Sequence, residues 1–454
     1  FAAIVPICGG GKPEDMQRIL KHFPEGASGK VVHIPMRDGI RLATTIVRPP
    51  GKGPWPVLFT KGYYGRSGMA GYARPCEEGG LVFVAQDSRG RGESEGRGSY
   101  DASTFQSELA DLDAMLDWLA AQPWCDGRIV MSGNSGNGVN PAIAVLTGNE
   151  HLKGAQAGGT SGVAAHWMYE NGVRRNLYDW MKHRGLKVED WPRPTPGPAG
   201  EACARAYLNG FAVNEETVLT LSSGWFDIVS EAPLDYFRAL GGKMPVYVAI
   251  GPSKHSGLAG INGTQWPRTS RPAWPPGLEE MLAGKAGEKP SHVVYYLMGD
   301  VNRPEGAGNE WRIAHAWPPE DAQQHRFYLH GQGSIEARPE REGAEPLRYT
   351  YDPSDPAPSL GGNVTYNDDA GPKDQRPLQE REDVLRFASE PLREAVAAAG
   401  PVTVSLSFST SAPDTLFVVK LVDIYPDGYE ALIRESGRWR GMPKDTAAGV
   451  RWSR

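Results

Sequence analysis

The sequence predicts an α/β fold followed by an all-β C-terminal part, and three observations carry that prediction. Short, almost wholly apolar runs recur through the first 325 residues, and such runs are typical of strands covered on both faces of a parallel sheet. Amphipathic helical patterns lie between those runs, which is the alternation of an α/β domain. After residue 326 the pattern changes to short β runs separated by turn clusters, which favours a β-sandwich.

The individual elements follow from the spacing of apolar residues. Residues 31–36 and 40–47 alternate on either side of a turn that contains Gly39, which predicts a β-hairpin. Near-continuous apolar runs predict buried strands at 56–59, 81–85, 128–131, 217–221 and 246–250. Leucine and methionine recur at helical spacing over residues 109–119, which predicts a helix whose acidic residues face mostly solvent. Three later runs predict strands of the sandwich, at 326–329, 402–408 and 416–421.

One segment interrupts the alternation of strands and helices. Residues 161–215 are rich in aromatic and charged side chains and contain a proline-rich loop at 192–198, which we interpret as an inserted helical cap. The predicted organisation is then an N-terminal extension (1–29), a first part of the α/β domain (30–160), the cap (161–215), a second part of the α/β domain (216–325) and the β-sandwich (326–454).

Composition narrows the function classes. The 454 residues include 48 Lys and Arg against 54 Asp and Glu, a formal net charge of −6 that argues against nucleic-acid or anionic-membrane partners. No run of about 18 apolar residues predicts a membrane span. The four cysteines are scattered and have no metal-site spacing, so neither a metal nor a cofactor is expected. We expect a soluble enzyme, cytoplasmic or exported, of a bacterial type; the oligomeric state is left open.

A glycine pair after the strand predicted at 81–85 has the start of a dinucleotide-binding pattern. Gly90 and Gly92 fit, but the third glycine would fall at residue 95, which is glutamate. A nicotinamide or flavin enzyme is therefore not expected. We interpret the segment as a turn in which Asp87 and Arg89 belong to a structural polar network.

A serine lies in a glycine-rich turn directly after the strand predicted at 128–131. The segment reads Gly133-Asn134-Ser135-Gly136-Asn137-Gly138 and precedes an apolar run. A nucleophilic serine on a sharp strand-to-helix turn needs small neighbours, because strand and helix nearly touch there. Gly133 meets that need, whereas the general pattern's second glycine is replaced by Asn137 and Gly138 comes one residue later. Taken alone, the segment is either a nucleophile turn or a polar connection.

An aspartate and a histidine follow two later strands in the order that a serine nucleophile requires. Asp227 lies just past the strand predicted at 217–221, and His255 lies just past the strand predicted at 246–250. Loops at the carboxyl ends of successive strands are where an open α/β sheet places its site. The chain order Ser, Asp, His is that of the α/β-hydrolases, in which the histidine is the base and the carboxylate orients it.

Further motifs occur in a fixed order over roughly residues 30 to 440. They are Gln86–Gly96, Trp118–Trp124 followed by Asp126-Gly127-Arg128, Gly224–Asp227, Gly251-Pro252 with His255, Tyr351-Asp352-Pro353, and Arg381–Leu385. Together they resemble the family of cocaine esterase, X-prolyl dipeptidyl aminopeptidase and α-amino-acid ester hydrolase, whose nucleophile turn has its second glycine where Gly138 stands. The resemblance implies an α/β-hydrolase fold with an inserted cap and a jelly-roll-like C-terminal sandwich.

The resemblance also implies a role for each candidate residue. Ser135 would be the nucleophile, His255 the base and Asp227 the carboxylate that orients the base. The backbone N–H of Gly136 and the hydroxyl of a tyrosine would hold the oxyanion. The family reads basic residue, any residue, proline, tyrosine at that place, and this chain reads Lys-Gly-Tyr-Tyr from residue 61, so the tyrosine falls at Tyr64. The alternative is that this tyrosine only packs at a strand end.

The resulting expectation is a serine hydrolase that cleaves carboxylic esters through an acyl-enzyme, with a small-molecule ester or amide as substrate. Amide or peptide cleavage stays open, including release of X-Pro dipeptides or of β-lactam side chains. A catalytically inactive binding or scaffold protein also stays open, because the chain departs from the family. Gly136 replaces a tyrosine and Ser253 replaces a frequent tryptophan; the chain also ends at Arg454, where the family's β domain normally continues, so the sandwich is truncated or completed differently.

Overall fold

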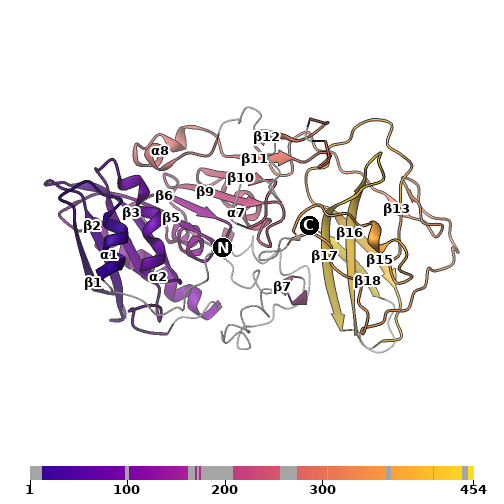
Figure 1. Ribbon diagram of the computed structural model, residues 1–454, viewed down its shortest axis with the longest axis horizontal. Helices are drawn as coiled ribbons and strands as arrows, with labels where there is room; N and C mark the ends of the chain where they lie inside the picture. Colours follow the sequence, from indigo (N-terminus) through magenta and orange to yellow (C-terminus); the bar gives the residue numbers. More distant parts are fainter. Residues whose placement is uncertain are drawn as a thin grey trace.

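A ten-stranded mixed sheet is the largest element of the fold and occupies the left and the middle of the view in Figure 1. The computed structural model describes residues 13–97, 102–161, 169–170, 173–174, 208–255, 274–303, 305–363, 370–412, 414–441 and 448–453. Across the sheet the strands are β1 (Ser28–Pro35), β2 (Arg41–Arg48), β4 (Val82–Asp87), β3 (Trp55–Gly62), β5 (Cys125–Asn134), β6 (Leu152–Gly158), β9 (Val218–Gly224), β10 (Val246–Gly251), β11 (His292–Leu297) and β12 (Glu310–Ala314). Every neighbouring pair from β4 to β11 is parallel, whereas β1–β2, β2–β4 and β11–β12 are antiparallel.

Helices and single helical turns connect these strands. They are α1 (Pro13–Leu20), η1 (Arg66–Cys76), α2 (Ala102–Ala120), η2 (Ser135–Gly138), α3 (Val139–Ala144), η3 (Val145–Thr147), α7 (Ala232–Leu240), α8 (Leu278–Leu282) and η5 (Ala286–Glu288). Among the described residues, no helix has both the length and the apolar character needed to cross a membrane.

Both faces of the sheet are covered, which is why successive residues of its inner strands are apolar. In β3, Val57 and Phe59 belong to one core cluster with residues of α2, α3 and α7, whereas Leu58 between them packs with residues of α1 and η1. In β10, Val248 lies on the first side and Tyr247 lies on the other with residues of α8 and η5. The predicted α/β arrangement, with strands buried on both faces, is therefore confirmed.

The strands β6, β11 and β12 are absent from the sequence prediction, and for β6 the reason is its composition. Its residues read Leu-Lys-Gly-Ala-Gln-Ala-Gly, which has too little large apolar side chain to register as a buried run. The glycines are required by packing: a Cβ on Gly154 would lie 2.5 Å from the Met281 sulfur, and a Cβ on Gly158 would lie 2.4 Å from Asn134 Oδ1. A strand selected for closeness to its neighbours carries little hydrophobic signal.

The part of the chain after residue 326, called here the C-terminal module, contains antiparallel strand pairs and one helical turn, η6 (Arg376–Leu378), in its described residues. The pairs are β13 (Tyr328–Leu329) with β14 (Ile335–Glu336), β15 (Thr403–Phe408) with β18 (Ala448–Ser453), and β16 (Asp414–Ile424) with β17 (Glu430–Gly441). The rings of Phe408 and Phe417 lie 4.3 Å apart and join the last two pairs. An all-β C-terminal part is as predicted.

The predicted cap at 161–215 falls mostly outside the described residues. Within it the structure describes Ser161, the two-residue strands β7 (Tyr169–Glu170) and β8 (Val173–Arg174), which pair antiparallel, and residues from Leu208 onward. The helical character of the cap and the four boundaries between the five predicted segments stay predictions. The change from one large sheet to small antiparallel pairs occurs after Ala314, near the predicted boundary at 325.

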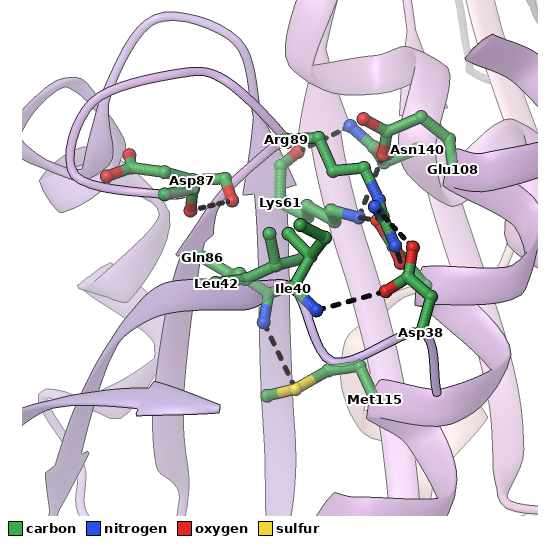
Figure 2. Close-up of polar contacts among 12 residues, drawn as sticks. Asp38, Ile40, Leu42, Lys61, Gln86, Asp87, Arg89, Glu108, Met115 and Asn140 are labelled. Atoms are coloured by element: carbon green, nitrogen blue, oxygen red, sulfur yellow. Dashed lines mark hydrogen bonds and ion pairs between the residues drawn. The ribbon is translucent and has the colours of Figure 1, made fainter. Parts of the chain in front are cut away.

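A buried network of charges joins β3 to the helix α2 and to the turn after β4 (Figure 2). The side chain of Lys61 is fully buried, and its Nζ lies 2.8 Å from Glu108 Oε2 and 3.7 Å from Asp111 Oδ2. Both carboxylates are buried, so the prediction that the acidic residues of α2 face mostly solvent is wrong for these two. Arg89 donates two hydrogen bonds to the Asp111 carboxylate, at 2.6 and 2.7 Å, and lies 2.7 Å from Asp38 Oδ2. Because buried charges are tolerated only when paired, these residues fix β3, β4 and α2 relative to one another.

A second group in the same region involves the other residue predicted there. Asp87 pairs with Arg66, which also pairs with Glu93. Burial raises the pKa of Asp87, and the Arg66 guanidinium opposes that shift. The structural network expected around Asp87 and Arg89 is confirmed.

We expect Lys61→Met to lower the free energy of unfolding by about 3–5 kcal/mol, because Glu108 would stay buried without its cation and Asp111 would keep only Arg89. Urea denaturation measures the change. The matched control is Arg37→Met, which removes exposed ion pairs to Asp113 and Asp117 and should cost no more than about 1 kcal/mol. Equal losses in the two variants would contradict the stabilising role of the buried network.

Candidate active site

Ser135 sits at the sharp turn between β5 and α3. Its φ is 56°, so a residue with a Cβ occupies the left-handed region of the backbone. That conformation is uncommon outside glycine, costs on the order of 1–3 kcal/mol and clusters at functional sites. It is the conformation that presents a serine hydroxyl above an α/β sheet.

Two glycines allow strand and helix to meet at this turn. A Cβ on Gly133 would lie 2.2 Å from the backbone oxygen of Asn137, and a Cβ on Gly138 would lie 3.0 Å from the backbone oxygen of Gly158 in β6. The second small position is therefore residue 138. At position 137, where the general pattern has glycine, the asparagine side chain is buried and accepts a hydrogen bond from the Tyr63 backbone N–H at 3.2 Å.

The structure brings Ser135, His255 and Asp227 together from the ends of β5, β10 and β9. Ser135 Oγ lies 2.8 Å from His255 Nε2, and His255 Nδ1 lies 3.1 Å from each oxygen of the Asp227 carboxylate. The side chains of His255 and Asp227 are buried. These are the three residues that the sequence selected by strand position and chain order.

The hydrogen-bond pattern determines which histidine nitrogen carries the proton. A carboxylate can only accept, so Nδ1 donates to Asp227 and Nε2 of a neutral ring accepts from the serine hydroxyl. Asp227 also accepts the backbone N–H of Val229 at 3.2 Å and the hydroxyl of Ser223 at 3.3 Å, which fixes the carboxylate on its turn. Within the described residues, no three His, Cys, Asp or Glu side chains are grouped so as to hold a metal ion.

The two consecutive tyrosines after β3 differ sharply in exposure. Tyr63 is 7% exposed, and its burial raises the pKa of the phenol well above the usual value, whereas Tyr64 is 43% exposed. Both residues lie in the bend just past the end of β3 at Gly62, and Tyr64 is the one whose side chain is accessible. Gly136, the predicted backbone donor, is buried in the first turn after Ser135. The roles of Tyr64 and Gly136 in holding an oxyanion stay predictions.

Tyr72 and Asn137 are site residues that sequence reasoning missed. The Tyr72 hydroxyl accepts the backbone N–H of Asn134 at 2.9 Å, directly before the serine. Burial raises the pKa of Tyr72, hydrogen bonds from Asn134 and the Asn137 side chain oppose that shift, and neighbouring Tyr64 adds to it. Nothing in the sequence around Tyr72 marks it. Asn137 did carry a signal, because it replaces the expected glycine of the turn.

Two family models match the chain. One is X-Pro dipeptidyl-peptidase (S15 family), over residues 38–217, and the other is the X-Pro dipeptidyl-peptidase C-terminal non-catalytic domain, over residues 285–441. The chain is also 29% identical to a cocaine esterase of Rhodococcus sp. over 87% of its own length and 80% of that protein. The chain belongs to the cocaine esterase and X-Pro dipeptidyl-peptidase family.

Solved structures agree with this family membership at the level of the fold. An α-amino acid ester hydrolase has a TM-score of 0.70 at 20% identity, covering 94% of this chain and 86% of that one. An aminopeptidase from a marine sediment archaeon, Thaumarchaeota archaeon, has a TM-score of 0.68 at 20% identity, covering 95% of this chain and 86% of that one. The large mixed sheet of this chain is thus of the α/β-hydrolase type.

We expect Gly133→Ala to lower esterase turnover by about 100-fold, because the added Cβ would push the strand away from Asn137 and displace Ser135. Steady-state hydrolysis of a p-nitrophenyl ester measures the loss. The control is Gly71→Ala, where an added Cβ meets no atom within 4 Å. Full activity in Gly133→Ala would show that the turn tolerates a wider separation.

Proposed function

We propose that Ser135, His255 and Asp227 are the catalytic triad of this serine hydrolase and that it cleaves carboxylic esters through an acyl-enzyme. The observation that carries the proposal is the unbroken series of hydrogen bonds from the Ser135 hydroxyl through both ring nitrogens of His255 to buried Asp227. The left-handed backbone of Ser135 supports it independently. Two similar proteins are named for ester hydrolysis, which supports an ester as the substrate class.

Each member of the triad has one task in this mechanism. His255 Nε2 takes the proton of Ser135 as the hydroxyl oxygen attacks the ester carbonyl, and Asp227 stabilises the imidazolium that results. The tetrahedral intermediate then collapses: the carbon–oxygen bond to the leaving group breaks, and His255 gives its proton to the departing alkoxide. Water repeats the sequence on the acyl-enzyme and releases the acid.

The developing oxyanion needs donors in addition to the triad. We assign the backbone N–H of Gly136 and the hydroxyl of Tyr64 to that task. Tyr63 is packed in the core, and its backbone is held by Asn137, so Tyr64 is the neighbour left on the exposed side. Donors fixed before the reaction stabilise the charge of the transition state without reorganisation.

Amide cleavage is a second candidate, because the model that matches residues 38–217 is that of an X-Pro dipeptidyl-peptidase. The same triad serves an amide if the leaving amine is protonated by His255. A panel of p-nitrophenyl esters and aminoacyl or X-Pro anilides separates the two, and we expect esters to be turned over faster.

For the C-terminal module we propose a jelly-roll-like sandwich, which the two antiparallel pairs joined by Phe408 and Phe417 support.

We expect Ser135→Ala, His255→Ala and Asp227→Asn each to remove most ester hydrolysis while leaving the fold intact. The losses should be strongly non-additive, since the three groups act as one unit. Single and double variants compared by kcat/KM test this. A Ser135→Ala/His255→Ala variant much worse than either single variant would contradict the assignment.

A fluorophosphonate probe separates an enzyme from an inactive scaffold. It should label the wild-type chain at Ser135 alone and should leave Ser135→Ala unlabelled. Absence of labelling in the folded wild-type chain would favour the scaffold.

Tyr64→Phe should lower kcat by about 10²–10³-fold with little change in KM, because an oxyanion donor acts mainly in the transition state. Tyr63→Phe is the matched control and should be close to neutral, since its ring is buried in the core. Steady-state kinetics with one ester substrate give kcat and KM for both variants. A loss confined to Tyr63→Phe would place the donor one residue earlier, and no loss in either would place it on another segment.

A further inference from the structure

Two side chains of the C-terminal module reach the turn that carries Asp227. Asn363 Nδ2 donates to the backbone oxygen of Asp227 at 2.8 Å and to Ser230 Oγ at 3.3 Å. Arg434 Nη1 donates to the backbone oxygen of Trp225 at 3.3 Å and to Ser230 Oγ at 3.1 Å. The hydrolase turn is therefore held from outside its own sheet.

Arg434 also forms an ion pair between the C-terminal module and the α/β part of the chain. Its Nη2 lies 3.0 Å from Oε1 of Glu231, which is the N-cap residue of α7. The guanidinium thus contacts Trp225, Ser230 and Glu231, which bracket Asp227 in the sequence. A planar fork of donors is suited to holding several oxygens in one fixed geometry.

The strand that carries Arg434 is irregular at this point. Leu421 of β16 pairs with Arg434 whereas Val422 pairs with Leu432, so β17 has one extra residue, Ile433, opposite the step. Such a bulge bends the strand and re-aims the neighbouring side chains. Leu432 is buried and Ile433 is exposed, and the side chain of Arg434 contacts Trp225 in the α/β part of the chain.

The Asp227 carboxylate moves with its backbone. Both of its oxygens bond to groups within a few residues, Ser223 Oγ and the Val229 N–H, so a shift of the turn shifts the carboxylate relative to His255. Each Asp227 oxygen lies 3.1 Å from His255 Nδ1, and a displacement of about 1 Å would lengthen these contacts beyond hydrogen-bond reach.

We infer that Asn363 and Arg434 are positioning residues for the ester hydrolysis: the C-terminal module holds the Asp227 turn at the distance that His255 requires. This inference rests on the proposed role of Asp227. The module then contributes to turnover without touching substrate, and its attachment to the sheet sets the alignment of the base.

The test compares Asn363→Ala and Arg434→Met with a control from the same module. We expect each variant to lower kcat by about 10-fold, and the pair together by up to about 100-fold, with KM nearly unchanged. Arg434→Lys keeps the charge but replaces the planar fork by a single donor nitrogen, and it should recover part of the loss. The control is Arg376→Met, which removes an exposed pair with Asp374 and should leave kcat unchanged.

A background that lacks the carboxylate distinguishes positioning from general destabilisation. In Asp227→Asn, adding Arg434→Met should cause little further loss, because Arg434 acts through a carboxylate that is already absent. An additive further loss, or wild-type kcat in both folded single variants, would overturn the inference. If Arg434→Met does not fold, Asn363→Ala alone carries the test, because it removes the 2.8 Å contact to the Asp227 backbone oxygen, and an unchanged kcat there would overturn the inference.

Failure of the proposed function gives a different result. If Asp227→Asn itself retains full activity, the triad assignment is wrong, whatever the activity of the Asn363 and Arg434 variants. If Asp227→Asn is inactive and the Asn363 and Arg434 variants match wild type, only the positioning role is wrong.

Discussion

The close approach of β5 and α3 around Ser135 is the constraint on which the rest of the site depends. A serine can keep a φ of 56° only if the residues on either side leave room, and Gly133 and Gly138 provide that room against backbone oxygens. The neighbouring strand β6 is built to the same requirement, since Gly158 leaves space for the Asn134 side chain. Tyr72 then closes the turn by accepting the Asn134 N–H. The strained serine is thus supported on every side by groups selected for size rather than for hydrophobicity.

The tyrosine segment and the nucleophile turn are joined at two points. Asn137 accepts the Tyr63 N–H at 3.2 Å, and Asn140 Nδ2 donates to the Lys61 backbone oxygen at 3.0 Å (Figure 2). Both asparagines belong to the helical stretch that begins at Ser135, so the end of β3 and the serine move as one body. Gly62 is what admits this arrangement, because a Cβ there would lie 1.9 Å from Asn137 Oδ1. A departure from the usual glycine at 137 therefore has a definite structural use.

Sequence reasoning selected residues that a local pattern marks, and it missed residues whose contacts are with distant parts of the chain. Ser135, Asp227 and His255 were selected because each follows a run of apolar residues, and parallel strands end at one edge of a sheet. Strand β6 was missed because close packing replaced its apolar side chains with glycine and alanine. Tyr72, Asn363 and Arg434 were missed because their partners are far away in sequence, and no local periodicity records a hydrogen bond over 62, 136 or 209 residues.

The buried group formed by Lys61, Glu108, Asp111 and Arg89 also bears on how sequences of this fold can vary. Its charges balance inside the protein, so a neutral replacement at one position is acceptable only when a partner of opposite sign is replaced with it. In a mutagenesis library aimed at new acyl-group preference, diversity is better placed elsewhere, because single changes in this group would remove clones through misfolding before their selectivity is ever sampled.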